Sequence, residues 1–461
     1  MDSSVNIINV ERVSPSNSDS SESLTLPLTF FDLIWFKMLA VKRVIFFRLT
    51  AATRTFFDSV IVPNLKTSLS LSLSHFLPLV GQLVWKQLDP KPSVVYSPNN
   101  AVSFTVAESN ADFSRLTGKE PFFSTELHPL VPELQISDDS ASVMSFQVTL
   151  FPNQGFCIGV AAHHAVLDGK TTTSFLKSWA HICKHQDSSL PHDLIPFYDR
   201  TVIKSPPSGD IMILNSWHSL VKMFIGKEPE NPKSLQLRPS PVISPDTVRY
   251  TLELTPVDIQ TLRERLKRES SSSSSSSTQL RLSTFVITYS YALTCVVRAR
   301  GGDPNRPVGC VFAADCRNIV TPPIPSSYFG NCAIGIGRIP LTADTFMGEE
   351  GFLASTRLVS DLVEGLDEGV VWKIPDFVEL SRSLPKEAQF LSVSGSTQFG
   401  VYGLDFGWGK PEKVVGVLID QGEAISLAEN RDGNGGVEVG FSLKKHEMDA
   451  LIDLLHNGLK V

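Results

Sequence analysis

Two apolar segments on either side of a short turn constrain the fold of this chain more than any other feature. SVMSFQVTLFP and GFCIGVAA have the composition of β-strands, and the PNQ between them is typical of a hairpin turn. The segment TTSFLKSWAHICKH follows and predicts a helix with one apolar face. That face is formed by Phe175, Leu176, Trp179, Ile182 and Cys183. The order of these elements predicts a mixed α/β protein.

Further strand and helix patterns occur along the chain. RYTLELT and PVGCVFAADCR predict strands, and PVDIQTLRERLKRE, LSTFVITYSYALTCVVRA and KKHEMDALIDLLHNGL predict helices. In LKTSLSLSLSHFLPLVG, leucines alternate with serines as they would in a strand. The same segment has a helical pattern, carried by Leu65, Leu69, Leu73, Phe76 and Leu77. Because the segment is long and ends at Pro78, we expect a helix.

The length of 461 residues is sufficient for two domains. Residues 1 to 24 are polar and predict a loose lead-in, and residues 186 to 245 lose periodicity and carry several prolines. We therefore expect an N-terminal domain over residues 1–205, a crossover linker over 206–245 and a C-terminal domain over 246–461. The serine run at residues 270–277 cannot bury a core, and it predicts a flexible surface insertion.

Composition and charge exclude several classes of protein. The net charge of -7 argues against a nucleic-acid partner. The N-terminus lacks the basic start and apolar stretch of a signal peptide, and no window has the roughly 18 apolar residues of a membrane span. The six cysteines show no CxxC spacing, so neither a disulfide framework nor a zinc site is expected. A reduced, cytosolic compartment fits this cysteine usage.

The stretch VAAHHAVLDGKTT, residues 160–172, is a candidate for acid–base chemistry. A histidine titrates near neutrality, so it can accept a proton from an alcohol or a thiol. If the preceding strand continues through His163 and His164, their side chains point to opposite faces, and only one faces a given cleft. Asp168 could orient an imidazole nitrogen, cap the following helix or pair with a distant arginine. Gly169 permits a tight turn or a close backbone approach.

The motif alone leaves several interpretations open. Zinc binding has little support, because HxxxD supplies only two ligands. A Ser–His–Asp hydrolase also has little support, because no GxSxG segment is present. A strand-to-helix turn holding two structural histidines remains an alternative to a catalytic base, since so short a pattern often occurs by chance.

Three other stretches extend the pattern. They are LKTSLSLSLSHFLPLVGQL at residues 65–83, YFGNC at 328–332 and DFGWG at 405–409. With HxxxD, this set resembles the plant BAHD acyltransferases, which depend on acyl-CoA. The resemblance extends to LSTF, DCRN with PPIP, GSTQF and FSLKKHEMDA, and so spans nearly the whole chain. One departure is Thr397, where the family commonly has proline.

The resemblance implies a fold and a reaction. The fold would be two domains related to chloramphenicol acetyltransferase, joined by a long crossover, with a solvent channel between them. CoA would enter from one side and the acceptor from the other. His164 would deprotonate the acceptor hydroxyl, which attacks the thioester directly, and would pass the proton to the CoA sulfur. The tetrahedral intermediate would need an oxyanion donor. His163 would be the structural histidine of the pair.

The resemblance also assigns supporting residues. Asp168 would point away from the substrate and pair with an arginine, for which Arg317 is the candidate. LSTF would open a helix on the CoA side, where Ser283 and Thr284 could contact CoA or serve only as a helix cap.

The DFGWG loop has two interpretations. Asp405 is sometimes counted as catalytic in such proteins. We expect instead that the motif shapes a loop near the CoA end, with Gly407 and Gly409 allowing an unusual backbone path and Trp408 packing against the protein.

The YFGNC, HHAVLDGKT and VYGLDFGWGKP forms resemble the subgroup that transfers malonyl from malonyl-CoA to flavonoid or phenolic glucosides, with the sugar 6-hydroxyl as the expected acceptor. The malonyl carboxylate would need a cation, for which Lys170, Arg338 and Lys410 are candidates. No resident cofactor is expected, and the chain would be a monomer. Three alternatives stay open: acetyl- or hydroxycinnamoyl-CoA with an alcohol or amine acceptor, a peptide-synthetase condensation domain, and a non-catalytic small-molecule binder.

Overall fold

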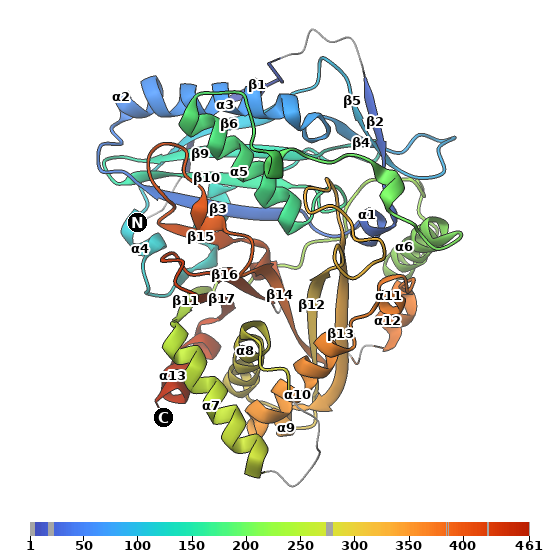
Figure 1. Cartoon of the computed structure of the whole chain (residues 1–461), viewed down its shortest axis with the longest axis vertical. Helices are drawn as coiled ribbons and strands as arrows, with labels where there is room; N and C mark the ends of the chain where they lie inside the picture. Colours follow the sequence, from blue (N-terminus) through green and yellow to red (C-terminus); the bar gives the residue numbers. More distant parts are fainter. Residues whose placement is uncertain are drawn as a thin grey trace.

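Two large β-sheets, one built mainly from each half of the chain, lie one above the other in Figure 1. The computed structural model describes residues 5–16, 23–272, 280–383, 385, 387–421 and 424–460. Of the serine run predicted to be a flexible insertion, residues 273–277 lie outside the described residues, and residues 270–272 end helix α7 (Pro256–Ser272).

The first sheet has six strands. In order across the sheet they are β1 (Val5–Val13), β6 (Val102–Ser109), β9 (Met144–Phe151), β10 (Gly155–Ala162), β3 (Val41–Arg48) and β15 (Lys413–Gly416). β9 and β10 form the predicted antiparallel hairpin, and every residue of both strands is buried. Continuous burial identifies them as central strands covered on both faces.

The lead-in expected over residues 1–24 is wrong in part. β1 pairs with β6 as the edge strand of the first sheet, and β2 (Leu24–Pro27) starts a smaller sheet. Within β1 only Val13 is buried, while Ile7 and Val10 are exposed. An edge strand with little burial lacks the apolar alternation by which strands are predicted, which explains why the sequence pattern missed it.

Helices α3 (Val62–His75) and α5 (Gly169–His185) lie side by side over the first sheet (Figure 1). The helix predicted in the leucine–serine segment is confirmed, although it begins earlier than expected. Leu65, Leu69 and Leu73 are buried at helical spacing. Ser68 and Ser72 are buried as well, because their hydroxyls donate to backbone carbonyls one turn earlier, at 2.7 Å each.

The second sheet has seven strands. In order across the sheet they are β13 (Ala333–Thr342), β12 (Pro307–Asp315), β14 (Gln389–Ser396), β16 (Ala424–Glu429), β17 (Val437–Lys444), β11 (Thr247–Leu254) and β7 (Phe122–Phe123). Helices α7, α8 (Thr284–Arg300), α10 (Gly351–Glu364) and α13 (Lys445–Leu459) lie below it in Figure 1. The predicted strands and helices of this half are confirmed, while the sequence patterns named no element over residues 333–383.

Two strands cross between the halves of the chain. β15 comes from the C-terminal half but pairs with β3 in the first sheet, and β7 comes from the N-terminal half but pairs with β11 in the second sheet. The division at residues 205 and 246 stays a prediction, and these exchanges show that both sheets depend on both halves of the chain.

The crossover contains a helix that the sequence pattern missed. α6 (Gly209–Ile225) lies within the segment expected to be an irregular linker. Its buried side consists of Gly209, Ile213, Leu214 and Trp217, but apolar residues such as Phe224 also lie on its exposed side. Apolar residues on both sides remove the helical periodicity on which prediction depends.

The remaining elements are short. A four-stranded sheet has the order β2, β5 (Ser93–Tyr96), β4 (Gln82–Val84) and β8 (Ser140–Ser142). The other helices are α1 (Phe30–Ile34), α2 (Arg54–Phe56), α4 (Phe113–Thr117), α9 (Ala343–Met347), α11 (Glu368–Val371) and α12 (Phe377–Ser383), with a π turn at Phe57–Ile61. Short 3₁₀ segments cover Leu77–Leu79, Ser124–Glu126, His128–Leu130, His192–Leu194, Arg200–Val202, Val401–Gly403 and Leu418–Gln421.

The core of the first half includes side chains from the second half. Tyr328, Phe329 and Cys332 are buried in the same apolar cluster as the first sheet and its helices. The loop that contains them is therefore fixed against the turn after β10. Among the described residues, no helix is long and apolar enough to cross a membrane.

Candidate active site

The two adjacent histidines follow the last residue of β10 and lie in different environments. His163 is fully buried, and its backbone N–H donates to the Val143 carbonyl at 2.9 Å. Its Nδ1 accepts the Ala165 N–H at 3.3 Å, which leaves the ring proton on Nε2. Burial lowers the pKa of His163 to about 3, so the ring is neutral at physiological pH. These contacts are those of a structural histidine.

His164 is half-buried, and its ring lies against an indole. The imidazole stacks on Trp35 with ring centroids 4.4 Å apart and an angle of 4° between the planes. Trp35 Nε1 donates to the Ala333 carbonyl at 2.9 Å, so the indole is itself fixed. Burial lowers the pKa of His164, and interactions with its own carbonyl, with Asp168 and with Asn331 oppose that change. A neutral ring of this kind can act as a base near neutral pH.

Asp168 performs two of the three functions that the sequence left open. Its Oδ1 accepts the Thr171 N–H at 2.8 Å and caps helix α5. Its Oδ2 accepts the Cys332 N–H at 3.0 Å and lies 2.8 Å from Arg317 Nη2. Both oxygens are engaged in these contacts, so the third function, orienting an imidazole, does not belong to Asp168.

Arg317 joins the two halves of the chain beside this turn. Its side chain is only 1% exposed, and its Nη1 lies 3.0 Å from Asp315 Oδ1. Its Nη2 also lies 3.3 Å from Thr171 Oγ1, and the Thr171 hydroxyl donates to the Gly330 carbonyl at 2.9 Å. The guanidinium thus holds the start of α5 against the YFGNC loop.

The YFGNC loop contacts the first half through successive residues. The Tyr328 hydroxyl accepts from Arg200 Nη1 at 2.8 Å. Asn331 donates from its backbone N–H to Asp32 Oδ1 at 2.8 Å. Gly330 has φ +136°, and a Cβ there would lie 2.5 Å from Arg200 Nη1, so the position requires glycine. The motif therefore docks this loop against the candidate base.

Gly169 is required for a close approach. A Cβ at this position would lie 2.7 Å from the Phe399 ring, closer than packed atoms come. Phe399 belongs to the turn after β14, which also contains Thr397. The glycine of the HxxxDG motif and the turn before DFGWG are thus packed against each other.

The DFGWG loop is closed by Asp405. Its Oδ1 accepts the N–H groups of Gly407 and Gly409 at 2.9 and 3.0 Å, and its Oδ2 lies 2.6 Å from Lys184 Nζ. Both glycines have positive φ, +106° and +96°. Lys184 lies near the C-terminal end of α5, whereas Gly169 begins it, and 15 residues of helix span about 22 Å. This separation from the His164 turn supports the structural interpretation of Asp405.

Aromatic packing fixes the same loop. The Phe406 ring packs edge to face against Trp179 at 5.0 Å and against Phe47 at 5.7 Å between ring centroids. Trp408 packs against Phe156 at 5.7 Å. These contacts hold the DFGWG loop on β3, β10 and α5.

The residues proposed to bind CoA and the malonyl carboxylate have other partners or are exposed. Ser283 caps α8, since its hydroxyl accepts the Val286 N–H at 3.3 Å, and Thr284 begins that helix. Lys170 Nζ lies 3.4 Å from Asp315 Oδ2, in a partly exposed ion pair. The two other candidate cations, on β13 and after DFGWG, are exposed; they are Arg338 and Lys410.

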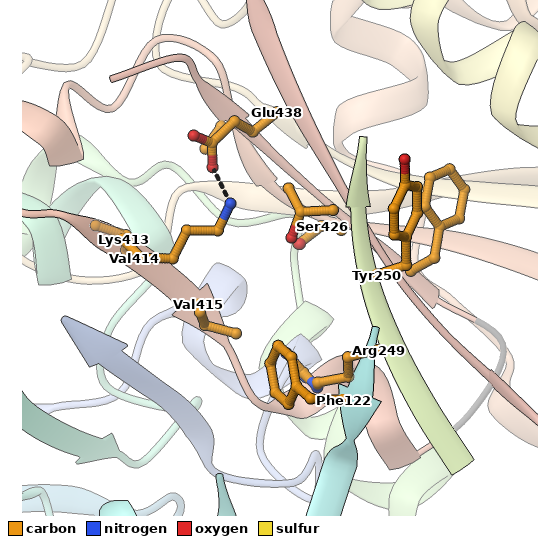
Figure 2. A pocket seen from close by; sticks show the side chains of 12 residues that line it. Phe122, Arg249, Tyr250, Lys413, Val414, Val415, Ser426 and Glu438 are labelled. Carbon is orange, nitrogen blue, oxygen red and sulfur yellow. Dashed lines mark ion pairs between the residues drawn. The ribbon is translucent and has the colours of Figure 1, made fainter. Parts of the chain in front are cut away.

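A small pocket lies where the two large sheets meet (Figure 2). Its lining includes Lys413 from β15, Arg249 from β11 and Glu438 from β17. Lys413 Nζ lies 3.4 Å from Glu438 Oε2, and the Tyr402 hydroxyl donates to the same oxygen at 2.7 Å. The lining does not include His164, so this pocket is not the candidate catalytic site.

Sequence reasoning missed three residues around His164. Trp35 and Asp32 lie in FFDLIW, whose aromatic residues are typical of a hydrophobic core. Asn331 lies in YFGNC, but the sequence assigned it no function. Among the described residues, no group of three or more His, Cys, Asp or Glu side chains could hold a metal ion.

A polar turn with one partly exposed histidine, held between two interlocked α/β halves, is the candidate active site, and the chain is an acyl-CoA-dependent acyltransferase. The sequence profile described as the Transferase family matches residues 3–454, and this chain belongs to that family, the BAHD acyltransferases. Phenolic glucoside malonyltransferase 1 of Arabidopsis thaliana is 72% identical over 463 residues, covering 100% of this chain and 99% of the relative. Malonyl-CoA:anthocyanidin 5-O-glucoside-6''-O-malonyltransferase of Arabidopsis thaliana is 48% identical, covering 99% of each chain.

Solved structures confirm the predicted fold class, an α/β protein related to chloramphenicol acetyltransferase. Vinorine synthase has a TM-score of 0.68 at 20% sequence identity, with 98% of each chain covered. The TRI101 protein of F. sporotrichioides, solved with coenzyme A and T-2, has a TM-score of 0.63 at 16% identity, with 93% of this chain and 97% of that chain covered. At these identities, the likeness concerns the fold alone.

Proposed function

We propose that this enzyme transfers malonyl from malonyl-CoA to a sugar hydroxyl, the 6-hydroxyl, of phenolic or flavonoid glucosides. The observation that carries the proposal is the 72% identity, over the whole chain, to a protein named as a phenolic glucoside malonyltransferase. A second relative, 48% identical, is named for transfer to the 6'' position of a glucoside. Malonyl-CoA is a co-substrate in this scheme, and no resident cofactor is required.

In the proposed reaction, His164 is the general base. Trp35 stacks on its imidazole ring, and burial lowers the pKa of the ring. The imidazole is therefore neutral when the acceptor binds. It removes the proton of the sugar hydroxyl as the oxygen attacks the thioester carbonyl, and it then delivers that proton to the departing CoA sulfur. No acyl-enzyme forms. The six cysteines are all buried, which agrees with their having no part in the chemistry.

Asp168 and Arg317 support the base without contacting substrate. Their ion pair fixes the start of α5 and the YFGNC loop, between which the His164 turn lies. Asp405 closes the DFGWG loop and ties it to α5. We place both carboxylates in the architecture of the site.

Donor recognition would use a cation near the acyl group. Lys170 directly follows Gly169 and is paired with Asp315 at 3.4 Å in a partly exposed setting. Exposed pairs of this kind contribute about 0–1 kcal/mol, so a bound malonyl carboxylate could replace Asp315 as the partner. The Ser283 and Thr284 segment at the start of α8 would contact CoA.

A second candidate reaction uses another acyl group and an amine. Agmatine coumaroyltransferase of Arabidopsis thaliana is 43% identical, with 98% of each chain covered. The higher identity to malonyltransferases favours malonyl transfer to a glucoside.

We further propose that the enzyme is a monomer and that it acts in the cytosol. The cysteine usage supports the cytosolic compartment.

The experiment is a screen of donors and acceptors by mass shift. Purified enzyme is incubated with malonyl-, acetyl- or coumaroyl-CoA and a panel of phenolic glucosides, free phenols and agmatine. We expect malonylated glucosides as the main products. Rapid consumption of coumaroyl- or acetyl-CoA, with malonyl-CoA left unused across all glucosides, would reject the malonyl donor.

A further inference from the structure

We propose that Arg43, on β3, determines the choice of donor: its guanidinium pairs with the free carboxylate of the malonyl group. This inference rests on the proposed malonyl donor and names the cation that such a donor needs. It differs from the cations expected from the sequence, which are Lys170, Arg338 and Lys410.

Arg43 is a partly buried cation whose recorded hydrogen bond goes to a neutral group. Its Nη1 donates to Thr173 Oγ1 at 3.3 Å, and the Thr173 hydroxyl donates in turn to the Gly169 carbonyl at 2.7 Å. Among the residues that the structure describes, no carboxylate forms an ion pair with this guanidinium. An anionic ligand can therefore pair with Arg43 without displacing another carboxylate.

The surroundings of Arg43 favour such a ligand. Burial lowers the pKa of Arg43 to about 10, and the charge of Glu429 opposes this change without forming an ion pair. Glu429 ends β16, where its Oε1 accepts the Tyr402 N–H at 3.0 Å. Arg43 remains charged at neutral pH. Its planar guanidinium can donate two parallel hydrogen bonds to a carboxylate, which is the strongest arrangement for such a pair.

Arg43 contacts both elements that flank the His164 turn. In the first sheet it is paired with Val160 of β10, and the chain reaches His164 four residues after Val160. Its hydrogen-bond partner Thr173 belongs to α5, which begins at Gly169 directly after the HxxxD motif. Four residues of helix span about 6 Å, so Arg43 meets α5 at its first turn. The guanidinium thus lies near the candidate base.

Open space adjoins Arg43 on the β15 side. Its partner on that strand is Gly416, and directly opposite residues of an antiparallel pair point to the same face. A Cβ at Gly416 would meet only Ser426 Cβ, at 4.0 Å, so packed atoms do not fill this position. Ser426 belongs to β16 in the second sheet, as Glu429 does. Arg43 therefore lies where the two halves of the chain meet, next to room for a small acyl group.

The other candidate cations are less selective for a malonyl group. Lys170 is already paired with Asp315 at 3.4 Å in a partly exposed setting, and Arg338 and Lys410 are exposed. An exposed cation is solvated with or without a ligand, so its ion pairs contribute little. A neutral acetyl group would instead leave Arg43 without an anion. Arg43 can thus favour malonyl-CoA over acetyl-CoA.

The test measures donor binding by calorimetry without an acceptor, with malonyl-CoA and acetyl-CoA as the two probes. In Arg43→Met, we expect the Kd for malonyl-CoA to rise by about 10–100-fold, because a charged hydrogen-bond partner is lost. The Kd for acetyl-CoA should stay the same. Arg48→Met is the matched control, because Arg48 ends the same strand but lies 3.4 Å from Glu412. Both Kd values should stay unchanged in that variant.

Three results would overturn the assignment of Arg43. They are a preference for malonyl-CoA that Arg43→Met retains, an equal weakening of both donors in that variant, and a greater loss of preference in Lys170→Met. If Arg43→Met does not fold, Arg43→Lys decides. It keeps the charge but loses the planar fork, so the preference for malonyl-CoA should still fall, and an unchanged preference would reject the proposal.

The donor screen keeps this inference separate from the proposed function. A wild-type enzyme that malonylates glucosides, together with any of these results, would overturn the assignment of Arg43 and leave the proposed function intact. A wild-type enzyme that malonylates none of the glucosides would overturn both.

Discussion

Arg317 Nη2 lies 2.8 Å from Asp168 Oδ2, and this buried ion pair joins the HxxxD turn of one half of the chain to the DCRN segment after β12 in the other. Because Asp168 also caps α5, the same carboxylate fixes the end of the turn that contains His164. The presence of an aspartate in the HxxxD motif is thus explained by its helix cap and its ion pair, and it requires no contact with substrate.

Removing one partner of this ion pair should destabilise the protein strongly. Asp168→Ala removes the buried partner of the Arg317 guanidinium and leaves only the partly exposed Asp315 carboxylate beside it; breaking a buried pair in this way costs about 3–5 kcal/mol. The midpoint of urea unfolding should fall accordingly. Asp315→Asn is the matched control, because the Asp315 side chain is 45% exposed, and that variant should unfold near the wild-type midpoint. Equal midpoints for all three proteins would contradict this account of Asp168.

Asp405→Asn should keep most of the activity. An asparagine oxygen can still accept the N–H groups of Gly407 and Gly409, and loss of the partly exposed pair with Lys184 costs about 0–1 kcal/mol. Steady-state kinetics and the melting temperature measure the two effects. A soluble Asp405→Asn protein that binds CoA normally but has lost its turnover would show that Asp405 takes part in the chemistry.

Gly169→Ala should destabilise the protein because of its contact with Phe399. The new methyl group would lie 2.7 Å from the ring, and overpacking of this kind costs about 1–3 kcal/mol. Removing the ring should restore part of the loss, so the double variant Gly169→Ala with Phe399→Leu should be more stable than the sum of the single effects predicts. Strict additivity of the two changes in unfolding free energy would exclude this contact as the cause.

The acid side of the pH profile should report His164. A base must be unprotonated, so kcat/KM falls as pH decreases through the pKa of the ring. Because burial lowers the pKa of His164, this fall should occur below the ordinary histidine value of about 6.5. Profiles with at least two acceptor glucosides distinguish the base from a titrating substrate. A fall in kcat/KM centred above the ordinary value would contradict a pKa lowered by burial.

The sequence predicted those parts of the fold that depend on local pattern. The hairpin of β9 and β10, the helices α3, α5, α7, α8 and α13, and the strands β11 and β12 follow from the spacing of apolar residues. β1 and α6 were missed, because an exposed edge strand and a helix with apolar residues on both sides lack a clear period. The exchange of β7 and β15 between the sheets depends on long-range pairing, which no local pattern records.

From the sequence, only those residues of the candidate site that belong to recognisable motifs could be predicted. HxxxD and the resemblance to BAHD enzymes identified His164, Asp168 and Arg317. The contacts of Trp35 and Asn331 with His164 were found only in the structure, because they join segments that lie far apart in the sequence. Both oxygens of Asp168 have other partners, so Asp168 is not the orienting partner of the base.

The most direct test of the central claim is the turnover of His164→Ala with malonyl-CoA and a phenolic glucoside, beside wild-type enzyme and His163→Asn. Loss of a positioned base should lower kcat by about 10²–10⁴-fold, while binding of CoA, measured by calorimetry, stays unchanged. A His164→Ala protein that turns over near the wild-type rate would contradict the assignment of His164 as the base.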